Sequence, residues 1–433
     1  MMTFFPTPLN EELLYSILAR YHIFSGNNTL ADTMKDIYNN HMTVASVMLP
    51  ARMNLLVENL PKNNLYSADY FIEEHTLYKY FVAFFDAERR DNIRNLMKKN
   101  NGGLVHAYCG LRRSNYRIND YLKICPKCMI NDMETGFLTW KRVHQLNISL
   151  CPFHDCALYN TKIPLKNINR HAFVPLKKEL FKTMTIIDYN KEKEQILQKI
   201  SLMSQELLDM DIVAKDREWF KTQYIELLKI KGYCNVNGVI SRSRLLEDME
   251  SFFSMELLST LNCEFNIQAK QNWVLDLVRK NKSDTSTIKH LIMIIFLESN
   301  INEIFNLKLT YQPFGSGPYP CLNHFCKDYM KSVINMIDYS YYDEVKRTLG
   351  TFKCHCGYTY KLIEGKSLSS ALVVDYGELW LDRLENVLEK KLSLNKTAKS
   401  MYIHKNTLYN ALSRYSVKHH FIRKASVGRK YNC

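Results

Sequence analysis

The sequence predicts a mainly α-helical, multidomain protein that carries small zinc-binding modules and a C-terminal helix-turn-helix. Three observations support this fold class. Amphipathic helical patterns recur along most of the 433 residues, and cysteines gather in two paired sets. The last segment, Lys390–Cys433, holds 11 Lys and Arg and no Asp or Glu. A chain of this length exceeds one ordinary hydrophobic core, so we expect two to four domains.

The composition is that of a globular protein, with 46% hydrophobic and 24% charged residues and a net charge of +14. Most of this excess lies in the basic C-terminal segment, which favours a phosphate-bearing partner, either nucleic acid or an acidic membrane surface; a solvated tail is the alternative. The N-terminus lacks a secretory pattern, and the apolar run 291–297 is far shorter than the roughly 20 residues of a membrane span. We therefore expect a soluble, cytoplasmic protein, in which cysteines serve as metal ligands rather than disulfides.

Helical periodicity begins at Leu13–Tyr21 and dominates residues 190–300, while the Gly315–Pro318 segment is a turn or linker signal. These shifts predict four regions. They are an N-terminal domain at 1–165 with a first zinc module at about 121–158, a helical middle region at 166–310, a second zinc module at 311–365 and a basic helix-turn-helix domain at 366–433.

The first cysteine set predicts a structural zinc site. Cys125 and Cys128 form a C-x2-C pair, and 22 residues later Cys151 and His154 form a C-x2-H pair. Each pair can occupy one edge of a tetrahedron, and four protein ligands leave no open position for catalysis. Unrelated buried or disulfide-bonded cysteines are the alternative.

The second cysteine set is less regular. Cys321 and Cys326 are separated by four residues, and Cys354 and Cys356 by one. A glycine directly after the last cysteine permits the positive φ that a metal-binding knuckle uses. We expect a second zinc ion here, so that the chain holds two; small buried cysteines on a hairpin are the alternative.

Other histidines and cysteines have weaker patterns. His144 and Cys156 lie within the first module, where we expect structural roles or contacts to the ligands from outside. His324 and His355 are near enough to replace one thiolate of the second set. The remaining cysteines are isolated and predicted to be ordinary thiols: Cys109, Cys234, Cys263 and Cys433.

The sequence contains no phosphate-binding loop, nucleophile elbow or zinc-protease helix motif, so we expect no enzyme and no catalytic residues. A nuclease or integrase with carboxylates assembled in space is the enzymatic alternative.

The basic C-terminal segment has the order of a helix-turn-helix. Residues 392–400 are predicted as a first helix, 401–404 as the turn and 405–415 as a second helix, with the small Ala398 allowing close approach. In such motifs the N-terminal part of the second helix enters the major groove of DNA. A helical hairpin with a solvated basic face is the alternative.

On this interpretation Asn406 and Asn410 read bases, since Asn pairs with adenine edges, whereas the cations anchor phosphates without specifying sequence. The full set of expected DNA contacts is Lys396, Lys399, Lys405, Asn406, Thr407, Tyr409, Asn410, Ser413 and Arg414.

Taken together, these motifs resemble the TniQ/TnsD family. The segment Phe5–His22 resembles its N-terminal signature, and the block Cys125–His154, with Trp140 and His-Gln-Leu between the pairs, resembles its zinc module. Residues 273–297 are similar to a later TnsD segment, and 321–358 resemble its second cysteine motif. Two departures, Asn147 for the proline after His-Gln-Leu and a missing His-Pro after Lys280, concern local loops.

The resemblance implies a sequence-specific DNA-binding protein that selects the target site of a bacterial transposon and is associated with the nucleoid. It implies recruitment of a TnsC-like AAA+ ATPase and, through it, of transposase subunits. One alternative is a TniQ-type adaptor that links a CRISPR effector complex to transposition, and another is a zinc-containing transcription regulator. The long second half and the basic C-terminal helices favour direct DNA reading.

Overall fold

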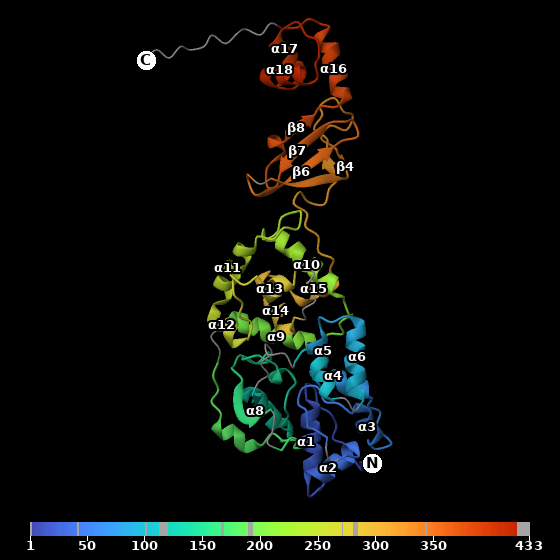
Figure 1. The fold of residues 1–433 in the computed structure, drawn as a ribbon, viewed down its shortest axis with the longest axis vertical. Coiled ribbons are helices and arrows are strands. Elements are labelled where there is room, and N and C mark those ends of the chain that lie inside the picture. The colour runs from blue at the N-terminus through green and yellow to red at the C-terminus, as the bar shows by residue number, and fades with distance from the viewer. Residues whose placement is uncertain are drawn as a thin grey trace, which may run out of the picture. The chain divides into compact units, whose positions relative to one another are not determined.

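The computed structural model describes residues 2–40, 43–99, 102–111, 120–165, 169–188, 194–270, 272–279, 285–342 and 344–421. The chain divides into two compact units. Unit 1 contains residues 1–233 and 241–310, and unit 2 contains residues 234–240 and 311–433. The fold is mainly helical, as predicted (Figure 1). The four regional boundaries predicted from the sequence stay predictions.

Unit 1 is built from helices and one short two-stranded sheet. In its first half these are α1 (Leu14–Phe24), α2 (Leu30–Tyr38), α3 (Met53–Glu58), α4 (Ala68–Glu74), α5 (Tyr78–Val82), α6 (Ala87–Lys98), α7 (Gly102–Tyr108), β1 (Tyr121–Ile124), α8 (Pro126–Thr135), the 3-10 helix η1 (Val143–Gln145), β2 (Tyr159–Pro164) and η2 (Lys178–Thr183). In its second half they are α9 (Gln195–Asp209), α10 (Arg217–Ile230), α11 (Arg242–Phe253), α12 (Met255–Thr260), α13 (Trp273–Asp276), α14 (Thr287–Phe296) and α15 (Ile301–Asn306).

Helix α14 is the central element of the second half of unit 1. Nine of its ten residues are buried, and it packs against α9, α5 and α13 (Figure 1). A helix that is apolar on nearly every side must be surrounded by others, which its sequence Thr-Ile-Lys-His-Leu-Ile-Met-Ile-Ile-Phe already indicates. Several helices of unit 1 begin at a polar N-cap side chain that accepts a backbone N–H. These caps include Thr29, Ser67, Asp86, Asp216 and Asn300.

Unit 2 contains an antiparallel sheet that the sequence did not predict. Its four strands lie in the order β5 (Ile337–Tyr342), β6 (Arg347–Lys353), β7 (Thr359–Ile363) and β8 (Leu372–Asp375). A separate pair, β3 (Tyr319–Pro320) and β4 (Ser332–Ile334), precedes it, and the 3-10 helix η3 (Leu368–Ser370) precedes β8. The chain then forms α16 (Glu378–Leu388), α17 (Leu394–Ser400) and α18 (Lys405–Arg414) (Figure 1).

One hydrophobic core joins the second cysteine set, the sheet and the three C-terminal helices. Phe352 and Tyr360 stack across β6 and β7 with ring centroids 4.8 Å apart. Tyr376 stacks on Trp380 of α16 at 4.1 Å, and the same cluster extends to Leu408 of α18. The helices predicted to bind DNA therefore fold together with the second cysteine set.

Candidate metal centres and nucleic-acid interface

The first predicted ligand set gathers where β1 meets α8. Cys125 is the N-cap residue of α8, and Pro126 occupies the first helical position, where its missing N–H costs nothing. Cys128 lies one turn into the helix, while Cys151 and His154 lie in the loop before β2. The two pairs predicted from spacing are thus brought together by a strand-to-helix junction and a loop.

The spacing of these four side chains fits a tetrahedral zinc ion. Zinc–sulfur bonds of about 2.3 Å and zinc–nitrogen bonds of about 2.0 Å require S···S edges of about 3.8 Å and S···N edges of about 3.5 Å. Nδ1 of His154 lies 3.6, 3.2 and 3.7 Å from the sulfurs of Cys125, Cys128 and Cys151. The sulfurs of Cys128 and Cys151 are 3.7 Å apart. The four residues could therefore hold a metal ion.

The electrostatics of this set favour a bound cation. All three cysteines are buried, so their thiolates would lack solvation unless a cation neutralised them. Hydrogen bonds from the Cys125 and Cys128 thiols lower the pKa of Cys151 to about 4. Cys151 is therefore the first of the set to ionise, whereas its hydrogen bonds to Cys125 and Cys151, together with burial, raise the pKa of Cys128. Ionisation of all three thiols, the form that binds metal, thus requires a neutralising cation.

His144 and Cys156 border this set without belonging to it. Nε2 of His144 lies 3.6 Å from the Cys151 sulfur and 3.8 Å from the Cys128 sulfur. Burial lowers the pKa of His144 to about 4, so its ring is neutral and its N–H can donate to these sulfurs. The Cys156 sulfur lies 3.2 Å from that of Cys125, closer than two zinc ligands stand. Both residues thus contact the ligands from outside, as expected.

The second predicted ligand set also comes together. Cys321 follows β3, Cys326 lies in the loop before β4, and Cys354 and Cys356 form the turn between β6 and β7. The four ligand atoms all lie within 4.8 Å of one another, and the sulfurs of Cys321 and Cys356 are 3.8 Å apart. This set could hold a second metal ion. Gly357 has φ +85°, the positive value expected at the knuckle.

The two histidines near this set are not needed to complete it. Nε2 of His355 faces Asp328 at 3.4 Å, and these two residues form a further group with Cys326 that could hold a metal. The His324 ring instead stacks on Tyr402 with centroids 4.4 Å apart. Four cysteines therefore suffice for the tetrahedron, without replacement of a thiolate.

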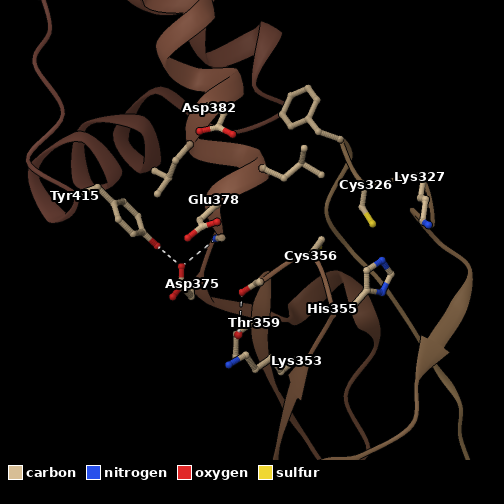
Figure 2. A pocket seen from close by; sticks show the side chains of 15 residues that line it. Cys326, Lys327, Lys353, His355, Cys356, Thr359, Asp375, Glu378, Asp382 and Tyr415 are labelled. Atoms are coloured by element: carbon tan, nitrogen blue, oxygen red, sulfur yellow. Dashed lines mark hydrogen bonds between the residues drawn. The ribbon is translucent and has the colours of Figure 1, made fainter.

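A groove of about 920 Å³ borders this second set (Figure 2). The knuckle residues His355 and Cys356 line it opposite Glu378 and Asp382 of α16 (Figure 2). Nearby, the Asp375 carboxylate accepts hydrogen bonds from the Tyr415 hydroxyl at 3.0 Å and the Gly377 N–H at 2.9 Å. The end of β8 is thereby tied to the residue that follows α18.

The two C-terminal helices occur where the sequence predicts them. α17 and α18 are joined by residues 401–404, and their contact buries Ala398, Leu408 and Leu412. Among the residues expected to contact DNA, Thr407 and Tyr409 are half-buried and the others are exposed. The exposed ones are Lys396, Lys399, Lys405, Asn406, Asn410, Ser413 and Arg414. That this pair is a DNA-binding helix-turn-helix stays a prediction.

A buried ionic network in unit 1 was missed by the sequence interpretation. The Glu12 carboxylate is fully buried and accepts from Arg20 through Nε at 2.9 Å and Nη2 at 2.5 Å. It also accepts from the Ser16 hydroxyl at 2.8 Å and the Leu9 N–H at 3.2 Å. The signal was present, since a carboxylate, a hydroxyl and a guanidinium follow one another every four residues at Glu12, Ser16 and Arg20, from just before α1 into its mainly apolar sequence.

The same network reaches the first metal module. The Ser16 hydroxyl accepts from the backbone N–H of Trp140, and the backbone of Glu12 pairs with Lys141. Arg142 donates to Glu11 at 2.8 Å. The N-terminal signature and the first ligand module are therefore joined by one buried polar network.

Within the described residues no helix is both long enough and apolar enough to cross a membrane.

Comparison with known proteins agrees with this arrangement. The model of the family described as Tn7-like transposition protein D matches residues 200–429, and that of the TniQ family matches residues 3–158. Transposon Tn7 transposition protein TnsD of Escherichia coli is 25% identical over 295 residues. These residues are 67% of this chain and 56% of that protein, so the chain matches little more than half the length of this curated relative. Because the TnsD match covers more than half of the chain and the TniQ match covers its N-terminal part, the protein belongs to the TniQ/TnsD family of transposition proteins.

Proposed function

We propose that this protein is a target-selection factor of a Tn7-like transposon that binds a specific DNA attachment site. The observation that carries the proposal is the TnsD match, which includes the exposed basic pair α17–α18. Cutting and joining of DNA then belong to partner proteins, and the chain itself acts as a non-enzymatic adaptor. Its contact with DNA is the step that chooses the insertion site.

Zinc is the metal that both cysteine sets suit best. Tetrahedral sets of three thiolates with one imidazole, or of four thiolates, are typical of structural zinc and leave no position for a substrate. The metal would stabilise the folded state by holding together loops that bury few apolar side chains of their own. This role agrees with the burial of three ligands in each set and with their positions in loops and next to the ends of strands.

The exposed side of α18 is the proposed reading surface. Asn406 and Asn410 are one helical turn apart and both exposed, so both can reach base edges in a major groove. Lys396 and Lys399 on α17 and Lys405 at the start of α18 would contact phosphates. Thr407, Tyr409, Ser413 and Arg414 complete the proposed contact set.

Recruitment of a TnsC-like AAA+ ATPase is the proposed second activity. It is inferred from the TnsD and TniQ matches, and the ATPase would in turn bring the transposase subunits. The CRISPR-adaptor alternative assigns the choice of site to a guide RNA, and the regulator alternative predicts binding at promoters instead of insertion sites.

A footprint of the purified protein on DNA flanking the insertion point of its transposon tests the proposal. We expect protection of one defined site, lost when residues 390–433 are removed. Asn406→Ala and Asn410→Ala should each weaken binding to this site by about 5- to 150-fold and relax its sequence preference, since a base contact is worth about 1–3 kcal/mol. Lys366→Ala, at an exposed position elsewhere in unit 2, is the matched control and should bind normally.

Uniform, unspecific binding would overturn direct site selection. If the protein then assembled with a guide-RNA effector complex, the adaptor alternative would hold. Protection of promoters in place of the insertion site would favour the regulator.

A further inference from the structure

The turn between α17 and α18 is held by a residue with an unusual conformation. Tyr402 has φ +57°, in the left-handed region that glycine or asparagine adopts at lower cost. Its side chain is 63% exposed, yet its ring lies nearly parallel to that of His324, at 14° and 4.4 Å between centroids. A tyrosine at this position is therefore explained by its stacking contact better than by the turn itself.

His324 belongs to the loop that carries the second ligand set. It lies between Cys321 and Cys326, and its other neighbour is the Tyr329 ring at 4.1 Å. The adjacent Phe325 ring lies 5.9 Å from Tyr402. The metal-binding loop thus presents an aromatic surface to the turn between the two helices.

The second pair of the ligand set, Cys354 and Cys356, lies next to the start of α16. The knuckle at Gly357 meets Gly377, the N-cap of α16, backbone against backbone. A Cβ added to Gly377 would lie 2.7 Å from the carbonyl oxygen of Cys356, so only glycine permits this approach. Between the two ends, the Arg383 guanidinium of α16 lies over the Phe325 ring at 5.7 Å.

Both loops of one ligand set therefore contact the helices, one at the start of α16 and the other at the α17–α18 turn. We propose that the second metal set orients α18 for DNA through the stack of His324 on Tyr402, so that metal retention at this set and DNA binding are coupled. This inference rests on the proposed function. Tyr402 and His324 act here as positioning residues, without themselves contacting bases.

Coupling of this kind must be reciprocal, because two ligands that favour the same arrangement of the protein strengthen each other equally. Specific DNA should therefore slow zinc release from the second set and leave the first set, in unit 1, unaffected. Coupling between sites typically changes an affinity by about 5- to 150-fold. We expect this change in zinc affinity to lie in the dissociation rate, so that zinc release slows by at least about fivefold.

The test measures zinc release to a colorimetric chelator from the full-length protein, with and without its DNA site. The release phase that Cys356→Ala abolishes reports the second set. Tyr402→Asn removes the ring and keeps a residue that accepts positive φ, while Tyr402→Phe retains the ring without the hydroxyl. His324→Ala removes the other side of the stack. Met336→Ala, at an 85% exposed position of the same unit, is the matched control.

Without DNA, zinc release from the second set should be about threefold or more faster in Tyr402→Asn and His324→Ala, and unchanged in Tyr402→Phe and Met336→Ala. The two variants that break the stack should bind DNA at least about fivefold more weakly, and DNA should no longer slow their zinc release. Unchanged release in the DNA-free arm overturns the positioning role, whatever the DNA result.

If wild-type protein bound no DNA while the DNA-free arm behaved as expected, the proposed function would fail and the coupling to DNA with it. The stack of His324 on Tyr402 would then stabilise the fold without affecting DNA binding. If DNA bound but zinc release did not respond to it, only the coupling would be overturned. Loss of binding in Tyr402→Phe would assign the effect to the hydroxyl instead of the stack.

Discussion

Replacing Arg20 by Met should destabilise unit 1 more than any surface change. The substitution keeps most of the aliphatic stem and removes the guanidinium, which makes two hydrogen bonds to Glu12 and a third, of 2.8 Å, to the Thr7 carbonyl. The Glu12 carboxylate then keeps only its bonds from Ser16 and the Leu9 N–H. A fully buried negative charge is left without a countercharge.

The expected cost follows from that burial. Removing one partner of a buried ion pair costs about 3–5 kcal/mol, because the remaining charge stays desolvated. A single domain is stable by only about 5–15 kcal/mol, so the loss is a large fraction of the total. Neutralising the other partner should recover part of it. We expect Glu12→Gln to raise the stability of the Arg20→Met variant by about 1–3 kcal/mol, although it destabilises the wild type.

Denaturant unfolding, followed by a signal from unit 1, measures these differences as a double-mutant cycle. Lys35→Met, at an exposed position on α2, is the control and should cost well under about 1 kcal/mol. Two results would contradict this expectation: Arg20→Met costing no more stability than the control, or Glu12→Gln lowering the stability of the Arg20→Met variant further. Either would mean that the Glu12–Arg20 ion pair does not stabilise the packing of α1.

Three other outcomes are expected. Metal analysis should find about two zinc per chain, with one lost in Cys128→Ala and the other in Cys354→Ala; a single zinc in the wild type would remove one site. Gly377→Ala should lower the melting temperature of unit 2 by several degrees more than Gly238→Ala, because both have positive φ but only Gly377 faces backbone within 3 Å. Burial lowers the pKa of His290 to about 3, so its stabilising contribution is present above pH 6.5 and is lost as pH falls. Unit 1 should therefore lose about 2 kcal/mol through this residue between pH 7 and 5, and His290→Phe should flatten that part of the pH profile of unfolding.

The helical part of the fold was accessible from the sequence because its signals are local. Apolar residues at helical spacing predicted a helical region at residues 190–300, and α9, α10 and α14 all lie within it. The sheet of unit 2 was not predicted, because the buried positions of its strands are not all apolar. The alternation of apolar and polar residues that identifies a strand is therefore incomplete in the sequence. On β6 these positions include Thr348 and Gly350, which do not read as apolar, and the aromatic Phe314 fills the space above the glycine.

The metal sets could be predicted because their ligands come in short pairs, so that local spacing decides which side chains converge. Contacts between distant segments could not. The His324–Tyr402 stack joins a loop to a turn that no pattern links, and the meeting of Gly357 with Gly377 depends on how β7 and β8 place the start of α16. The Glu12–Arg20 pair is intermediate, because its spacing was visible but its burial was not.

Charged side chains occupy contrasting environments in the two units, and salt should separate their roles. In unit 1 the Glu12–Arg20 and Glu11–Arg142 pairs are buried, where ions of the solution screen little. Among the described residues no carboxylate lies within ion-pair distance of the exposed cations on α17–α18, which are Lys396, Lys399, Lys405 and Arg414. Four phosphate contacts would make DNA affinity fall by roughly 150-fold between 50 and 200 mM salt, because each contact releases counterions.

The unfolding midpoint of unit 1 should change little over the same range of salt. Each Lys→Ala substitution on α17–α18 should reduce the salt dependence of DNA binding by the equivalent of about one contact, whereas Lys366→Ala should not. A DNA affinity that is indifferent to salt would mean that these cations face solvent in the complex. The basic C-terminal segment would then serve solubility and not recognition, and the base contacts proposed for Asn406 and Asn410 would lose the anchor that positions them.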